Sequence, residues 1–280
     1  MKAGTLYVVA TPIGNLEDIT FRALRVLREV AVVAAEDTRR SGLLLRHFGI
    51  ATPLVSLHQH NEGQKTESLL SRLRGGESVA VVSDAGTPAV SDPGAVLVAA
   101  ARAAGIRVEP IPGASAVMAA VSAAGLPDDE HFGFFGFPPV KAKDRERWFT
   151  GAIMASAGMS VVFFEAPHRI LATLEELSNR SLTRILVFRE LTKLHESSYD
   201  GAPAVVAGMI SPVAGEFTVV IPRSKDDDSA VERPSDDEVR RMFGQITDKK
   251  ARDAARQVAA ATGLTANEVY DIVRRSGADD

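Results

Sequence analysis

The sequence predicts an α/β protein with two α/β domains and a small helical segment at its C-terminal end. Between residues 5 and 222, short apolar runs of strand length alternate with stretches whose apolar residues recur at helical spacing. This rhythm pauses at Gly125-Leu126-Pro127, and only helical patterns follow the charged stretch SKDDDSAVERPS. We therefore expect domains at 1–116 and 117–223, a linker at 224–235 and a helical segment at 236–280.

Four apolar runs in the first half predict strands that are buried on both faces of a mainly parallel sheet. They are LYVVATP (5–11), VAVVAA (30–35), VAVVS (79–83) and IRVEPI (106–111). Covering helices are predicted at FRALRVLREV (21–30), TESLLSRLRGG (66–76) and PGAVLVAAARAAG (93–105). The same alternation resumes in the second half with the strands SVVFFE (160–165), RILVF (184–188) and FTVVIP (217–222).

The segment 236–280 is predicted to contain two helices that meet at Thr262-Gly263, with Thr265 and Glu268 at capping-box spacing. The spacing fits a helix-turn-helix, and a small helical cap is the alternative. Six cations in this segment are candidates for RNA binding: Lys249, Lys250, Arg252, Arg256, Arg274 and Arg275. Lys249, Arg252 and Arg256 share one helical face, with Ala251, Ala255 and Val258 on the other. A solvated face stays possible, because the segment carries eight Lys/Arg against nine Asp/Glu.

Composition limits the classes of function. The chain has 280 residues, of which 45% are apolar and 24% charged, as in ordinary globular proteins. The absence of Cys excludes disulfides and thiolate metal sites and suits a cytoplasmic location. A net charge of −4 means that nucleic-acid contacts would come from local patches. We expect no membrane span, no signal peptide and no metal: His58, His60 and Glu62 fit a polar loop on the substrate side better than a metal site.

Four loops rich in small residues follow predicted strands and lead into helices. They are TPIGN (11–15), AEDTRRS (35–41), SDAGTPAVSDPG (83–94) and PGAS (112–115). In an open α/β sheet all four lie at the carboxyl edge of the strands, where ligands bind. Glycine lets a ligand approach the backbone, and helix N-termini offer N–H groups to anions. Neither G-x-G-x-x-G after a strand nor a phosphate-binding P-loop occurs. The loops therefore predict a cradle for a small polar ligand other than a dinucleotide or triphosphate.

These motifs, together with PIPGASA, FFEAPHR, RELTKLHE and GEFTVVIP, resemble the bacterial small-subunit ribosomal RNA methyltransferase I family. The resemblance covers about residues 4–222 and, weakly, the helical tail. It implies two α/β domains of the tetrapyrrole-methylase type (a class III methyltransferase), which binds S-adenosylmethionine without a Rossmann glycine fingerprint. It further implies methylation of a cytidine 2′-hydroxyl in the decoding region of 16S rRNA, within the small ribosomal subunit, by a homodimer.

The resemblance places the cofactor in the cleft between the two α/β domains. The residues that it implies there are Pro12, Ala85, Gly86, Thr87, Val90, Ser115, Ala116 and Ala166. Asp84 would accept a hydrogen bond from the cofactor's ammonium group, and an Asx turn within its own loop is the alternative.

Several charged side chains are candidates for helping a weakly nucleophilic ribose hydroxyl. Asp37 and Arg39 are preferred, because AEDTR ends a strand beside the cradle; Asp37 would orient or deprotonate the hydroxyl. The other candidates are Glu36, Glu190 and Lys193, followed by Glu165, His168 and Glu196. Structural ion pairing is the alternative role for each.

Two other functions stay open. A tetrapyrrole (precorrin-type) methyltransferase would share the fold and the cofactor, although AEDTR, FFEAPHR and the helical tail speak against it. A non-catalytic RNA-binding protein would keep the fold, but would not need an intact cofactor cradle.

Overall fold

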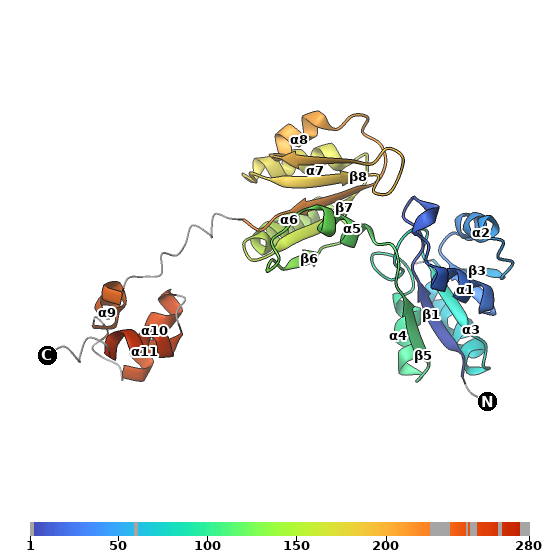
Figure 1. Ribbon diagram of the computed structural model, residues 1–280, viewed down its shortest axis with the longest axis horizontal. Helices are drawn as coiled ribbons and strands as arrows, with labels where there is room; N and C mark the ends of the chain where they lie inside the picture. Colours follow the sequence, from blue (N-terminus) through green and yellow to red (C-terminus); the bar gives the residue numbers. More distant parts are fainter. Residues whose placement is uncertain are drawn as a thin grey trace. The chain divides into compact units, whose positions relative to one another are not determined.

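The computed structural model describes residues 3–58, 61–224, 236–244, 246, 251–262 and 265–274. The chain forms two compact units, Met1–Arg223 and Ser224–Asp280, which are described separately. Within the first unit, one lobe holds a sheet of the first 111 residues and a second lobe holds a sheet of residues 132–221 (Figure 1).

The first lobe is a five-stranded parallel sheet in the order β3-β2-β4-β1-β5. Its elements are β1 (Thr5–Val9), η1 (Leu16–Asp18), α1 (Phe21–Glu29), β2 (Val32–Ala35), α2 (Thr38–His47), β3 (Leu54–Ser56), α3 (Glu62–Arg74), β4 (Val79–Val82), α4 (Ala95–Ala103) and β5 (Arg107–Ile111). Every predicted strand of this lobe is confirmed, and the short edge strand β3 is an addition. Three residues are too few to show a periodic pattern.

Helices cover both faces of this sheet, so the side chains of its inner strands alternate between two cores. Leu69, Leu73 and Leu97 of α3 and α4 pack with Val32 of β2 on one face. Val26 and Leu27 of α1 and Leu45 of α2 pack with Val33 of β2 on the other. The strands β2 and β4 are therefore buried throughout.

The prediction that the strand is buried on both faces of the sheet is wrong for β5. This strand lies at the edge of the sheet, where Arg107 is exposed and forms an ion pair with Glu109. The strand β1 is also only partly buried.

The second lobe is a mixed sheet in the order β6-β7-β10-β8-β9. Its elements are α5 (Ala116–Ala123), β6 (Phe132–Phe134), α6 (Ala142–Ser156), β7 (Ser160–Glu165), α7 (Ile170–Asn179), β8 (Ile185–Arg189), β9 (Ser197–Gly201), α8 (Pro203–Met209) and β10 (Phe217–Ile221). Only β6 and β7 are parallel. The other pairs are antiparallel, because β9 turns back along β8 and β10 inserts between β7 and β8. Helix α5 packs on this sheet through Val117 and Ala120.

The described residues of the second unit form three helices, α9 (Asp236–Gly244), α10 (Ala251–Thr262) and α11 (Ala266–Arg274), around Val239, Val258 and Val269. The capping box is confirmed: Glu268 Oε2 accepts from the Thr265 amide at 2.8 Å, and the Glu268 amide donates to Thr265 Oγ1 at 3.3 Å. Ala251 is exposed, so its predicted place on the apolar face is wrong; Ala254 packs inward in its place.

The predicted RNA-binding cations are only partly within the described residues. Arg252 and Arg274 are exposed, and Arg256 belongs to α10. Lys249, Lys250 and Arg275 lie outside the described residues, as does the predicted linker beyond Ser224. In the described part of the chain, no helix has the length and apolar character to cross a membrane.

Candidate active site

The four small-residue loops meet where the direction of the chain connections reverses. The strands β1 and β4 are neighbours in the sheet. The connection from β1 passes β4 to reach β2, whereas the connection from β4 passes β1 to reach β5, so the two connections run in opposite directions. In open α/β sheets, ligands bind at such a point, outside the carboxyl ends of the strands. Here Thr11 and Gly86 join the first and third loops by two backbone hydrogen bonds of 2.9 and 3.0 Å. Gly86 has a φ of +80°, which glycine adopts without strain.

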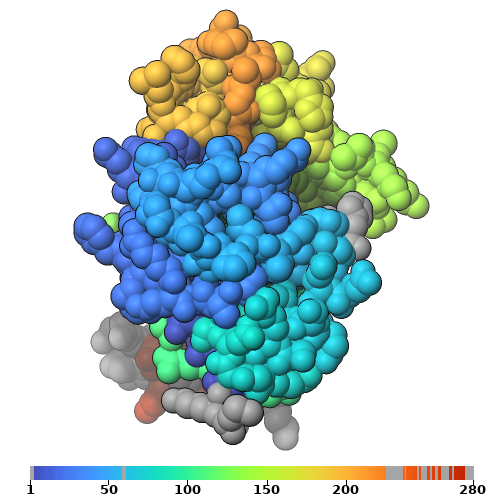
Figure 2. Space-filling view, turned by 90° about the vertical axis from the view of Figure 1, so that its right-hand side faces the viewer, coloured from blue at the N-terminus to red at the C-terminus, as the bar shows by residue number. Residues whose placement is uncertain are grey.

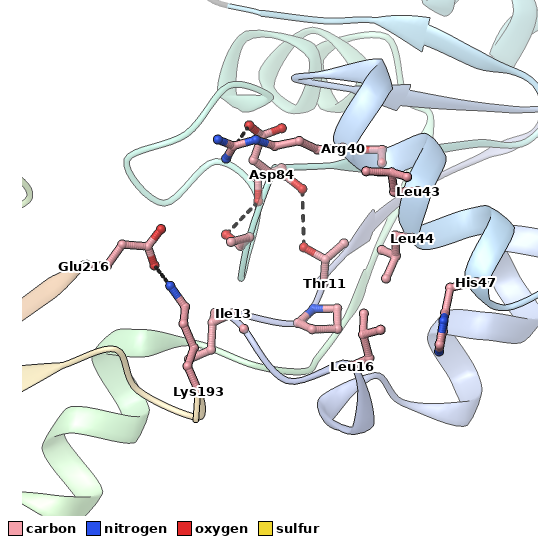
Figure 3. A pocket seen from close by; sticks show the side chains of 15 residues that line it. Thr11, Ile13, Leu16, Arg40, Leu43, Leu44, His47, Asp84, Lys193 and Glu216 are labelled. Atoms are coloured by element: carbon pink, nitrogen blue, oxygen red, sulfur yellow. Dashed lines mark hydrogen bonds and ion pairs between the residues drawn. The ribbon is translucent and has the colours of Figure 1, made fainter. Parts of the chain in front are cut away.

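Two cavities are lined by residues of these loops. The first, of about 510 Å3, lies between α2, η1 and the loop that carries Lys193 (Figure 3). The second, of about 380 Å3, is lined by Glu36, Asp92, Ala116, Phe164 and Ala166. Both cavities are lined by a shared set of residues: Ile13, Arg40, Asp84, Ala85 and Glu216. The site therefore has the form of two adjoining chambers with a common wall, and we name them the α2 cavity and the acidic cavity.

Five of the predicted cofactor residues line one or both of the two cavities. Asp84, Ala85, Ala116 and Ala166 line the acidic cavity, and Pro12 lines the α2 cavity. The others hold the loops. Thr87 Oγ1 donates to the Ala114 carbonyl at 3.3 Å, and Ser115 caps α5 by accepting from the Met118 amide. Gly86 binds Thr11, and Val90 is exposed.

Five carboxylates line the acidic cavity: Glu36, Asp84 and Asp92, together with Glu165 and Glu216, which form ion pairs with Arg169 and Lys193. Burial and the charge of Asp84 raise the pKa of Glu36. Burial and the charge of Glu36 raise the pKa of Asp92 to about 6. The negative charge of Asp84 is compensated, because its side chain accepts a hydrogen bond from the Asp37 amide at 3.0 Å and lies 3.3 Å from Arg40 Nη1. The cavity is therefore electrostatically suited to a cationic ligand.

Asp37 and Arg39 bind each other. Asp37 caps α2 by accepting from the Arg39 amide at 2.8 Å, and its other oxygen accepts from Arg39 Nη2 at 2.7 Å. These hydrogen bonds lower the pKa of Asp37. The Arg39 side chain is 88% exposed, and neither residue is among those lining the two cavities of the described chain. Their part in the reaction stays a prediction, whereas their neighbour Glu36 lies in the acidic cavity.

Lys193 reaches across to the first lobe. Its Nζ donates to Glu190 at 2.8 Å and to Glu216 at 3.1 Å. Its stem packs so closely on Gly14 that a Cβ there would fall 2.2 Å from Lys193 Cγ.

Although burial acts to lower the pKa of Lys193, the two carboxylates raise it. Burial raises and the Lys193 hydrogen bond lowers the pKa of Glu190, with a net lowering. Lys193 is thus a fixed cation rather than a proton acceptor.

Three of the remaining candidates, Glu165, Glu62 and Glu196, have structural partners. Glu165 is fully buried between Arg169, at 2.6 Å, and Arg145, at 3.7 Å. Buried Glu62 accepts from the amides of Gly94 and Val96 at 2.9 and 3.0 Å and so caps α4. His168 is exposed, and Glu196 accepts from the Thr192 amide. In the described part of the chain, no group of His, Asp and Glu could hold a metal ion, and His60 lies outside it.

Several wall residues were not predicted. Arg40 belongs to the loop AEDTRRS and Asp92 to the loop SDAGTPAVSDPG, so membership of these loops could have indicated both. Leu16, Leu43 and His47 line the α2 cavity from η1 and α2, and no sequence pattern marks them. Phe137 and Phe164 pack with ring centroids 5.4 Å apart in the acidic cavity.

Comparison with known proteins identifies the family of the chain. Residues 5–203 match the family model described as Tetrapyrrole (Corrin/Porphyrin) Methylases. Curated proteins named "Ribosomal RNA small subunit methyltransferase I" are similar to the chain. That of Pseudomonas aeruginosa is 54% identical over 70% of both chains. That of Xylella fastidiosa is 44% identical over 95% of this chain and 98% of its own. That of Synechocystis sp. is 42% identical over 99% of both.

Solved structures with the same fold include uroporphyrin-III-C-methyltransferase from Thermus thermophilus. It has a TM-score of 0.56 and 23% identity, and it covers 79% of this chain and 94% of its own. A diphthine synthase has a TM-score of 0.61 and 16% identity, and it covers 79% of this chain and 90% of its own. At these identities the similarity concerns the fold, and it confirms the expected fold class of the first unit.

Proposed function

Because this chain belongs to the ribosomal RNA small subunit methyltransferase I family, of tetrapyrrole-methylase fold, we propose that it methylates the 2′-hydroxyl of a cytidine in the decoding region of 16S rRNA, with S-adenosylmethionine as donor. The observation that carries the proposal is the pair of adjoining cavities, since methyl transfer needs a donor and an acceptor aligned at one point. Mapping of 2′-O-methylation on 16S rRNA from cells with and without the gene tests it. Loss of one cytidine mark supports the proposal, and an unchanged map contradicts it.

The acidic cavity fits S-adenosylmethionine chemically. When bound, this cofactor supplies a methyl group on a cationic sulfonium and also carries an ammonium group. Glu36, Asp84 and Asp92 would compensate these charges, and the small side chains of Ala116 and Ala166 leave room for the ligand. The rings of Phe137 and Phe164 offer an apolar wall to the adenine.

The cofactor affinity should depend on the protonation of Asp92. Its pKa of about 6 means that it is anionic above this pH and neutral below it, and a cationic ligand prefers the anion. The dissociation constant for S-adenosylmethionine, measured by calorimetry, should therefore rise as the pH falls through 6, by up to about tenfold per pH unit. Asp92→Asn should flatten this dependence, and Asp129→Asn, at an exposed site, should retain it. A parent affinity that is constant across this range would contradict the charge argument.

Glu36 is the carboxylate we propose as the proton acceptor for the ribose hydroxyl. It comes from the AEDTR loop, as Asp37 does, but it lies in the acidic cavity, and burial and the charge of Asp84 raise its pKa. Asp37 and Arg39 remain the competing assignment, with Asp37 orienting or deprotonating the hydroxyl. Amide variants of the two carboxylates, Glu36→Gln and Asp37→Asn, separate these assignments.

The helical tail is proposed to bind RNA phosphates through its six candidate cations. The support is the predicted cationic face of α10, of which Arg252 is exposed. Replacing Lys249, Lys250, Arg252, Arg256, Arg274 and Arg275 by Gln should weaken RNA binding. It should also flatten the salt dependence of the RNA affinity, by about 0.7–0.9 in log–log slope for each phosphate that the tail no longer neutralises. Cofactor affinity should persist. An unchanged salt slope would show that the tail makes no phosphate contacts.

The proposed setting is the cytoplasm, with the small ribosomal subunit as partner and a homodimer as the active form. The family resemblance supports these assignments. Light scattering of the purified protein tests the dimer, and a monomeric mass at working concentration would contradict it.

A further inference from the structure

We propose that the α2 cavity holds the acceptor nucleotide, with its base against the leucines of α2 and η1 and a backbone phosphate on Arg40. This inference rests on the proposed function and names the part of the molecule that would carry the RNA side of the reaction. The acidic cavity already suits the cationic donor, and the second chamber adjoins it along the shared wall of Ile13, Arg40, Asp84, Ala85 and Glu216. An acceptor hydroxyl has to reach that wall.

One face of α2 lines the cavity, and its side chains change from a cation at one end to leucines farther along the helix. Arg40, Leu43, Leu44 and His47 stand at i, i+3, i+4 and i+7, so they share one side of the helix. Figure 3 shows them facing the cavity in this order, with Arg40 at the end beside Asp84. The Arg40 cation is thus nearest to the shared wall, and Leu43, Leu44 and the His47 ring are farther from it. A nucleotide has the matching order, because its ribose and phosphate lie to one side of its base.

The leucines at this cavity are unusually exposed for their type. Leu43 is 62% exposed and Leu16, which approaches from η1, is 41% exposed. Single exposed leucines are ordinary, but two that line one cavity form an apolar surface available to a flat ring. A cavity lined from both lobes would accept one nucleotide rather than a duplex, so the acceptor would have to be unpaired or turned out of its stack.

Arg40 is the cation that is available for a phosphate. Among the described residues its ion-pair partner is Asp84, at 3.3 Å, and its side chain is 68% exposed, so exchanging partners costs little. Lys193, on the opposite wall, is held by Glu190 and Glu216. The geometry therefore assigns the phosphate contact to Arg40, and Lys193 closes the cavity on the side of the second lobe (Figure 3). The α2 helix lies on the face of the first lobe that Figure 2 turns toward the viewer, among the blue elements.

Two substitutions with matched controls test the assignment on the full-length protein. The substrate is small ribosomal subunits from cells that lack the gene. Leu43→Ser should lower kcat/KM for the subunits by at least about tenfold. Arg40→Gln should weaken RNA binding and reduce its log–log salt slope by about one. Leu43→Ser should leave that slope unchanged, because it removes no charge.

The control variants carry the same two kinds of substitution, Leu to Ser and Arg to Gln, at positions outside the cavity. Leu171→Ser alters a leucine of α7 that is also partly exposed, and Arg102→Gln alters an exposed arginine near the end of α4. Because α4 starts at the carboxyl edge of the sheet, its last turn lies at the opposite edge. Both controls should methylate the subunits as the parent does.

The outcomes separate this inference from the proposed function. A parent protein that methylates no RNA would overturn the proposed function itself. An active parent with parent-like kcat/KM in Leu43→Ser and an unchanged salt slope in Arg40→Gln would overturn the inference alone. Calorimetric loss of S-adenosylmethionine binding in Leu43→Ser would assign the α2 cavity to the donor and also overturn it.

Discussion

Ala116→Phe is expected to abolish measurable binding of S-adenosylmethionine, weakening it by at least about a hundredfold, or about 2.7 kcal/mol. Ala116 is the first residue of α5 and lines the acidic cavity, whose volume is about 380 Å3. A phenyl ring at this position would occupy space that the ligand needs. Because the helix begins here and the side chain is only partly buried, the fold should tolerate the change.

The matched control is Met118→Phe, two residues along the same helix. Met118 is 55% exposed and is not among the residues lining the acidic cavity. Calorimetry should give the parent affinity for this variant, and circular dichroism should show both variants folded. A folded Ala116→Phe protein with parent-like affinity would contradict the assignment of the acidic cavity to the cofactor.

Glu36→Gln is expected to reduce single-turnover methylation by about 10²–10⁴-fold, the usual contribution of a general base. The amide keeps the shape of the side chain and can still accept from the Asp84 amide, which lies 3.5 Å from Glu36 Oε2. Cofactor affinity should fall much less, because Asp84 and Asp92 remain in the cavity.

The pH profile identifies the proton acceptor. A base must be deprotonated to act, so the parent rate should rise with pH and level off above the pKa of Glu36. Because that pKa is raised by burial and by Asp84, the plateau should begin at a higher pH than for an ordinary glutamate. The rising limb should vanish in Glu36→Gln.

Asp37→Asn is the comparison that decides between the two carboxylates. The Asp37–Arg39 pair is near the surface, and such pairs contribute about 0–1 kcal/mol, so the rate should change only a few-fold. A hundredfold loss in Asp37→Asn together with a parent-like Glu36→Gln would assign proton transfer to Asp37.

The sequence predicts the site well where local patterns determine it. Each of the four loops follows a strand of one parallel sheet that the apolar runs predict, so their meeting at one sheet edge follows from topology. The capping box at Thr265 likewise depends on residues three apart. Three strands of the second lobe, β7, β8 and β10, were predicted from their apolar runs, whereas β6, β9 and the antiparallel pairing depend on contacts between distant segments.

Other features of the site depend on long-range contacts that no local pattern encodes. Glu62 caps α4 from another helix, more than thirty residues away in sequence, although the sequence places it only in a polar loop. Lys193 packs on Gly14 across the two lobes. Asp37 appears in the sequence as a charge at a strand end, and only the fold shows that Arg39 engages it while Glu36 lines the acidic cavity.

Transfer of a radiolabelled methyl group from S-adenosylmethionine to purified small ribosomal subunits tests the proposed function most directly. The subunits come from cells lacking the gene, and the product is digested to nucleosides. We expect close to one methyl group per subunit, recovered as 2′-O-methylcytidine from the decoding region. No incorporation, or a label recovered on a base or on another nucleoside, would contradict the proposed reaction.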